Sequence, residues 1–186
     1  MHAINLWVVV LYYILQTNII WVMEIDWSEK KKEILNKLLA QKKVELRNAE
    51  ISLERIKQTA IESPGRMESR YDSTKQEYSY LADDVSESIK RNSSEIKQLE
   101  ELIKDCANLI SDGLIGSGSI IRAALDGQSR AYMLLLFGSS EIITDEVLGG
   151  IHTVSSASPI GMLLLNRKVG DTIELNNKKI IIKEVR

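Results

Sequence analysis

The sequence predicts an α+β protein in which an antiparallel coiled-coil helical hairpin is followed by a small domain of strands and one short helix. Two observations carry this prediction. Apolar residues recur at alternating steps of four and three over residues 28–110, whereas residues 111–186 hold short aliphatic runs separated by turn residues. We therefore expect an apolar N-terminal segment at 1–27, the hairpin at 28–110 and the small α+β domain at 111–186.

The hairpin prediction rests on two apolar series separated by one helix breaker. The breaker is Ser63-Pro64-Gly65, where proline ends the incoming helix and suits the first turn of the next one. Because the break is short, the two series should pair with each other around a tip at 62–72, with a homodimeric coiled coil as the alternative. The series, which Lys42 interrupts once, are Leu35, Leu39, Lys42, Leu46, Ala49, Leu53, Ile56 and Ala60, then Tyr78, Ala82, Val85, Ile89, Asn92, Ile96, Leu99, Ile103, Cys106 and Ile110.

Beyond residue 111 the chain alternates aliphatic runs with turn signals. Asp126-Gly127 and Asn176-Asn177 are pairs typical of tight hairpin turns. Ser158 followed by Pro159 predicts the capped start of a short helix. The expected strands cover 120–125, 131–137, 152–155, 172–175 and 179–185, and the expected helix covers 159–165.

The first part of the chain supports two interpretations. Residues 4–23 carry no charged side chain and are long enough to span a bilayer, with a basic cluster at 30–32 following them. Alternatively, Met23 starts the native protein and the apolar residues are an over-extension. The first interpretation predicts a membrane-anchored protein that contacts the bilayer through 4–23, and the second predicts a cytoplasmic protein.

The charge balance argues against sequence-specific contact with DNA. Residues 28–110 carry 16 basic and 16 acidic side chains, and residues 111–186 carry 8 of each. A protein that neutralises phosphates needs a basic excess, which neither part has. With one cysteine and two histidines, the chain cannot form an intrachain disulfide or a zinc cluster of the usual Cys/His type.

A serine run, a Ser-Pro pair and a Lys-x-Gly-Asp turn surround the expected short helix. The residues are Ser155, Ser156, Ser158, Pro159, Gly161, Lys168, Gly170 and Asp171. This pattern resembles the closing signature of the Gre (GreA/GreB-type) transcription elongation factors of bacteria. The resemblance implies an N-terminal hairpin, a C-terminal domain of FKBP-like fold, and an accessory factor that is not itself an enzyme.

The resemblance also implies a partner, bacterial RNA polymerase. In the family, the C-terminal domain docks on the polymerase and the hairpin enters the secondary channel. Two acids at the tip there help to hold a Mg²⁺ ion and its attacking water, and the polymerase hydrolyses its own backtracked RNA. For this chain it implies no tightly bound cofactor and at most a Mg²⁺ ion shared with the polymerase. The partner contacts expected in the C-terminal domain are Ser158, Pro159, Gly161, Lys168, Gly170 and Asp171.

The tip of the hairpin departs from the family pattern, which runs Asp-Leu-Ser-Glu-Asn-Ala-Glu-Tyr with a lysine further on. Aligned on Tyr71, this chain has Pro64 in place of the aspartate and Met67 in place of the first glutamate. Neither side chain offers Mg²⁺ an oxygen ligand, which argues against stimulated transcript cleavage. The remaining candidates are the acids Glu62, Glu68 and Asp72, with Glu68 and Asp72 able to share the Mg²⁺ ion, and the partner contacts Arg66, Arg70 and Tyr71.

Two other functions fit parts of the sequence. A membrane-tethered coiled-coil interaction protein would use residues 4–23 as its anchor. The FKBP-like fold also suggests a peptidyl-prolyl isomerase, although such enzymes line a pocket with several aromatic side chains and residues 111–186 contain only Tyr132 and Phe137. The tip acids, in turn, also fit the plain role of solvated negative charge at a helix start.

Overall fold

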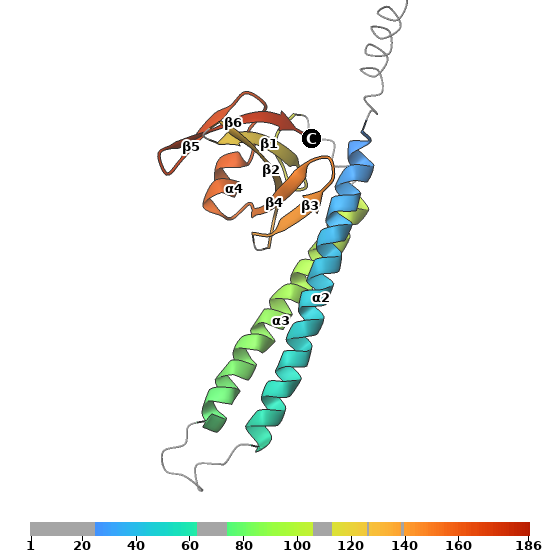
Figure 1. Cartoon of the computed structure of the whole chain (residues 1–186), viewed down its shortest axis with the longest axis vertical. Coiled ribbons are helices and arrows are strands. Elements are labelled where there is room, and N and C mark those ends of the chain that lie inside the picture. The colour runs from blue at the N-terminus through green and yellow to red at the C-terminus, as the bar shows by residue number, and fades with distance from the viewer. Residues whose placement is uncertain (1–24, 63–73, 106–112, 126, 139) are drawn as a thin grey trace, which may run out of the picture.

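The computed structural model describes residues 25–62, 74–105, 113–125, 127–138 and 140–186. Two long helices form a hairpin that packs on one face of a six-stranded sheet, and a short helix covers the other face (Figure 1). The predicted α+β fold, a helical hairpin followed by a strand-rich domain, is confirmed. The expectations for residues 4–23 and for 63–72 lie outside the described residues. Among the helices that are described, none has the length and apolar character needed to cross a bilayer.

The hairpin consists of α2, Trp27–Glu62, and α3, Thr74–Asp105. Asp26 precedes α2, and its Oδ1 accepts a hydrogen bond from the backbone N–H of Ser28 at 2.9 Å, which satisfies one of the free donors at the helix start. The described members of the predicted apolar series line the contact between the two helices, and Cys106 and Ile110 lie outside the described residues. The described members are half-buried in the distal part of the hairpin and become fully buried at Leu35 and Leu99, beside the sheet.

The sheet is mixed, with strand order β3-β4-β2-β1-β6-β5. Only β2 and β4 pair in parallel, and the other four pairings are antiparallel. Five of the six strands lie where the sequence predicts strands, although β2 and β4 each begin three residues earlier. The strand β3 was not predicted. The elements are β1 Ile120–Leu125, β2 Gln128–Leu135, β3 Ile142–Asp145, β4 Gly149–Ser155, α4 Pro159–Leu164, β5 Thr172–Leu175 and β6 Lys178–Val185.

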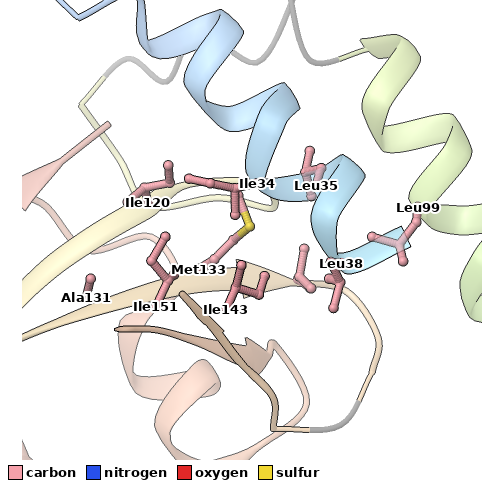
Figure 2. Packing of buried hydrophobic residues seen from close by; sticks show 10 residues of the cluster. Ile34, Leu35, Leu38, Leu99, Ile120, Ala131, Met133, Ile143 and Ile151 are labelled. Atoms are coloured by element: carbon pink, nitrogen blue, oxygen red, sulfur yellow. The ribbon is translucent and has the colours of Figure 1, made fainter. Parts of the chain in front are cut away.

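Apolar side chains fill two layers, one on each face of the sheet. The first layer joins the hairpin to the sheet: Ile34 and Leu38 of α2 point toward Met133 of β2 (Figure 2). The second layer lies under α4, where Leu164 packs with Leu134 and neighbouring strand residues. Because Ile34 and Leu38 lie outside the predicted heptad series, α2 carries two apolar stripes, one facing α3 and one facing the sheet.

The predicted turn at Asn176-Asn177 joins β5 to β6. Both residues have positive φ angles, 52° and 64°, as a two-residue turn of type I′ requires. Asparagine tolerates this left-handed backbone better than most residues. The turn therefore fixes the register in which Leu175 pairs with Lys178, and with it the outer edge of the sheet.

Candidate functional site

The distal end of the hairpin holds one of the predicted site residues that the structure describes. Glu62 is the last residue of α2, it is exposed, and its Oε1 accepts a hydrogen bond from Nε2 of Gln58 at 3.4 Å. The other candidates at the tip lie outside the described residues, namely Glu68, Asp72, Arg66, Arg70 and Tyr71. Within the described ranges, no group of three or more His, Cys, Asp or Glu side chains could hold a metal ion.

The hairpin projects well beyond the sheet domain. The first half of α2 is attached to the sheet through Ile34, Leu38 and Lys42, whereas its second half extends away from it (Figure 1). From Glu45 to Glu62 the helix runs a further distance of about 25 Å at about 1.5 Å per residue. The described part of the hairpin is thus a helical arm that carries its end away from the sheet domain.

The first half of the C-terminal signature forms a compact turn that starts α4. The Ser158 hydroxyl donates to the carbonyl oxygen of Ser155 at 2.6 Å and accepts from the N–H of Gly161 at 3.1 Å, so Ser158 is the predicted N-cap. A Cβ atom on Gly161 would lie 1.9 Å from the Ser155 carbonyl oxygen. These residues of the signature therefore have a structural role, because they form the turn that starts α4.

The second half of the signature forms the turn that leads into β5. The Lys168 N–H donates to Oδ2 of Asp171 at 3.1 Å, and the Asp171 N–H donates back to the Lys168 carbonyl at 3.1 Å. Gly170 has a φ of 92°, which an L-residue rarely adopts. Its N–H donates to the carbonyl of Ile182, so the turn is tied to β6. The two halves of the signature thus lie at the two ends of α4.

Four apolar side chains are exposed along and beside α4. Met162 is 62% exposed and Leu165 is 37% exposed, and Val169 in the following turn is 52% exposed. Leu114, at 46%, pairs with Lys168 in an isolated β-bridge and so lies next to the turn that follows α4. We call these four residues the α4 patch. Its apolar character, next to the signature residues, makes it a candidate contact surface.

An ion pair fixes the start of α2 to the end of β3. Nζ of Lys30 lies 2.7 Å from Oδ2 of Asp145, whose side chain has no exposed surface. Oδ1 of Asp145 accepts from the N–H groups of Val147 and Leu148, each at 3.0 Å. Burial alone would raise the pKa of Asp145, but the hydrogen bonds from Lys30 and these N–H groups outweigh it, so the pKa of Asp145 is lowered.

A second charged cluster fixes the middle of α2 to the start of β3. The Lys42 side chain is 5% exposed, and its Nζ contacts Glu141 beside β3, Glu95 of α3 at 3.2 Å and Glu45 of α2 at 3.3 Å. Burial by itself lowers the pKa of Lys42, but the hydrogen bonds and charges of Glu141 and Glu95 outweigh it, and the pKa of Lys42 is raised. We call Lys42, Glu45, Glu95 and Glu141 the Lys42 cluster.

The heptad series places Lys42 in the hairpin contact but does not identify its partner Glu141, which lies just before β3. A lysine at an apolar heptad position was a usable signal, because a buried ammonium needs carboxylates around it. The signal did not identify the carboxylates. Glu141 precedes β3 and Asp145 is its last residue, and because the sequence does not predict this strand, it does not predict that the two carboxylates converge on α2.

The buried Asp145 makes the stability of the protein sensitive to acid. Because its folded-state pKa is lowered, its contribution is complete above the unfolded pKa of about 4 and is lost as the pH falls through the lower folded value. We expect the melting temperature to fall below about pH 4, and Asp145→Asn to flatten that fall while lowering stability at neutral pH. Circular dichroism melts across this pH range measure both effects.

The control for this prediction is Glu146→Gln, which changes an exposed acid next to Asp145. It should leave the acid-side fall in melting temperature as it is in the unmodified chain. An Asp145→Asn variant that loses stability in acid as steeply as the unmodified chain would contradict the assignment.

No protein-family model matches the chain, and no curated protein sequence matches it. Solved structures that are similar to it include the following two. One is the GreA factor homolog 1 (Gfh1) protein of Thermus thermophilus, at 20% sequence identity over 83% of this chain and 94% of that chain, with a TM-score of 0.31. The other is the transcription factor Gfh1, at 19% identity over 83% of this chain and 92% of that chain, with a TM-score of 0.32. Similarity at this level does not establish the family to which the chain belongs.

Proposed function

We propose that this chain is a Gre-like regulator of transcription elongation that binds bacterial RNA polymerase. The observation that carries the proposal is the C-terminal signature around α4, which follows a helical hairpin in the chain. Ser158, Gly161 and Asp171 each have a defined local role in building α4 and the turn after it. We infer that a chain with this signature also has the α4 surface that the signature residues hold in place.

In this proposal the α4 patch is the docking surface of the sheet domain. Met162, Leu165 and Val169 would be covered by the polymerase, with the exposed cations Arg167 and Lys168 at the edge of the contact. Exposed apolar side chains surrounded by polar groups are typical of protein contact sites. The signature residues at both ends of α4 hold this surface in shape and border it.

The hairpin in turn would reach into the secondary channel of the polymerase. Its distal half extends about 25 Å past the sheet domain, which suits an arm that enters a pore while the domain stays outside. With Pro64 and Met67 at the two positions where the family pattern has acids, we propose that the chain occupies the channel without stimulating transcript cleavage. Glu62, Glu68 and Asp72 are the carboxylates that such cleavage would still require.

Binding is tested with the full chain and bacterial core RNA polymerase. We expect the two to co-elute at micromolar concentration. Met162→Asp should weaken binding by about tenfold or more, because it places a charge in a surface from which the bound polymerase would exclude water. Val147→Asp is the matched control, since Val147 is 56% exposed in the turn between β3 and β4, away from α4. Absence of co-elution, or equal loss in both variants, would contradict the proposal.

The absence of cleavage stimulation is tested on a stalled, backtracked elongation complex. We expect no increase in the rate at which the RNA 3′ end is released when the chain is added, and no difference when Glu62, Glu68 or Asp72 is changed to alanine. If the chain increases the rate, and if changing Glu62, Glu68 or Asp72 abolishes the increase, then a carboxylate outside the family positions can help to hold the Mg²⁺ ion. That result would correct the mode of action while leaving polymerase binding in place.

A further inference from the structure

The strand β3 is an edge strand whose free side offers hydrogen-bonding groups. Among the described strands, β3 pairs only with β4. The Thr153 N–H donates to the Glu141 carbonyl, which fixes the alternation of the antiparallel ladder. By that alternation Ile143 exchanges hydrogen bonds with β4, whereas the backbone N–H and C=O groups of Ile142 and Thr144 point away from it. Such a row of groups is a template for another strand.

A groove lies at the start of β3, between Glu141–Ile142 and α2. Its volume is about 500 Å³, which is within the range of ligand-binding pockets. Val44 of α2 and Ile142 of β3 are 60% and 59% exposed, and both line it. The remaining lining residues are Ala40, Gln41, Glu45 and Glu141. A largely apolar groove at the start of an open edge strand combines the two features by which extended peptides are bound: backbone pairing and side-chain pockets.

The charge of the groove selects its occupant. Glu45 and Glu141 line it and belong to the Lys42 cluster, in which one ammonium faces three carboxylates. At the other end of β3 the charges are evenly matched, because the two carboxylates Asp145 and Glu33 both contact the two lysines Lys30 and Lys37. The acidic excess therefore lies at the Glu141 end, where a lysine or arginine side chain would be attracted.

We propose that the groove binds an extended segment of a partner protein that alternates aliphatic and basic residues and pairs with β3 as a seventh strand. This contact is separate from the α4 patch and does not depend on the proposed polymerase contact. A second copy of the same chain fits less well. β3, Ile142–Asp145, carries no basic side chain, so a second copy pairing edge to edge would bring no cation from this strand to the acidic end of the groove.

The test uses the full chain and a fluorescein-labelled heptapeptide of alternating valine and lysine. We expect binding with a Kd below about 1 mM by fluorescence anisotropy, and slower exchange of the Ile142 and Thr144 amide protons in NMR spectra of the complex. A peptide of alternating valine and glutamate, and a valine-lysine peptide with N-methylated valines, should both fail to bind. The valine-glutamate peptide lacks the positive charge that the groove attracts, and the N-methylated peptide lacks the valine N–H groups needed for pairing with β3.

Variants of the edge and of the groove wall test the location. Thr144→Pro should weaken binding by about tenfold, because it removes an outward N–H that β4 does not use. Thr172→Pro is its control: the Ile182 N–H donates to the Asp171 carbonyl, so the Thr172 N–H points outward on the opposite edge strand, β5. Circular dichroism melts check that both variants fold.

Should Thr144→Pro fail to fold, Val44→Lys tests the same groove from the helix side, with Val169→Lys as its control at 52% exposure. Val44→Lys should weaken binding of the basic peptide by like-charge repulsion, and Val169→Lys should not. The proposal is overturned if the valine-glutamate peptide binds equally well, if the edge or groove variants bind like their controls, or if the chain self-associates through β3 in the absence of peptide.

Discussion

Replacing Lys42 with methionine should lower the free energy of unfolding by about 3 kcal/mol. Methionine fills a similar volume, so the loss comes mainly from charge: Glu95 and Glu141, which are 19% and 17% exposed, would face each other without the ammonium between them. Glu45 is 49% exposed and contributes less, because water screens it. Urea denaturation at neutral pH, followed by circular dichroism, measures the change.

The neighbouring residue supplies the control. Lys43 is 54% exposed and its Nζ lies 2.8 Å from Glu100, so Lys43→Met removes an ion pair of similar length at the surface. That variant should lose less than about 1 kcal/mol. Adding Glu141→Gln to Lys42→Met should restore part of the lost stability, because one of the repelling charges disappears. Equal losses in the two lysine variants would show that the buried cluster adds no more than a surface pair.

Besides its contribution to stability, the Lys42 cluster connects three segments that are far apart in the sequence. It connects α2, α3 and the segment before β3, while Lys30 and Asp145 connect α2 to the other end of β3. The shared apolar layer around Met133 lies between these two charged contacts. The angle at which the hairpin leaves the sheet domain is therefore set by directional contacts as well as by apolar packing.

The sequence predicts the hairpin well because a heptad series is a long, repeated signal. It predicts β3 poorly because the strand has four residues, only one of which, Ile143, is a buried aliphatic side chain. The other buried position is Asp145, whose burial depends on Lys30 from a distant part of the chain. A local pattern cannot report a charge that is stabilised by a residue more than one hundred positions away.

The sequence predicts the start of β2 three residues too late for a related reason. Gln128, Ser129 and Arg130 are exposed and polar, so no apolar signal identifies them as strand. They become strand because the turn at Gly127 brings them opposite β1, where backbone pairing continues to Leu125. Backbone hydrogen bonding, unlike side-chain burial, leaves little trace in the composition of a strand.

The short helix α4 was predicted from Ser158 and Pro159, but the requirement for Gly161 becomes clear only in the structure. Changing Gly161 to alanine should destabilise the protein by about 3 kcal/mol. The added Cβ would lie 1.9 Å from the Ser155 carbonyl oxygen and 2.9 Å from Cα of Ser156. Both are backbone atoms, so the whole capping turn would have to move and the Ser158 hydrogen bonds would be lost or lengthened.

The sign of this effect separates the close contact from ordinary helix propensity. Gly161 lies inside a helix, and propensity alone predicts that alanine stabilises it by about 1 kcal/mol. Gly116→Ala is the control, because a Cβ there meets nothing within 4 Å and the backbone does not have a positive φ; it should change stability by less than about 0.5 kcal/mol. A Gly161→Ala variant as stable as the unmodified chain in thermal and urea denaturation would show that the turn before α4 can yield. In that case the serine and glycine of the signature would not be needed to shape the α4 patch.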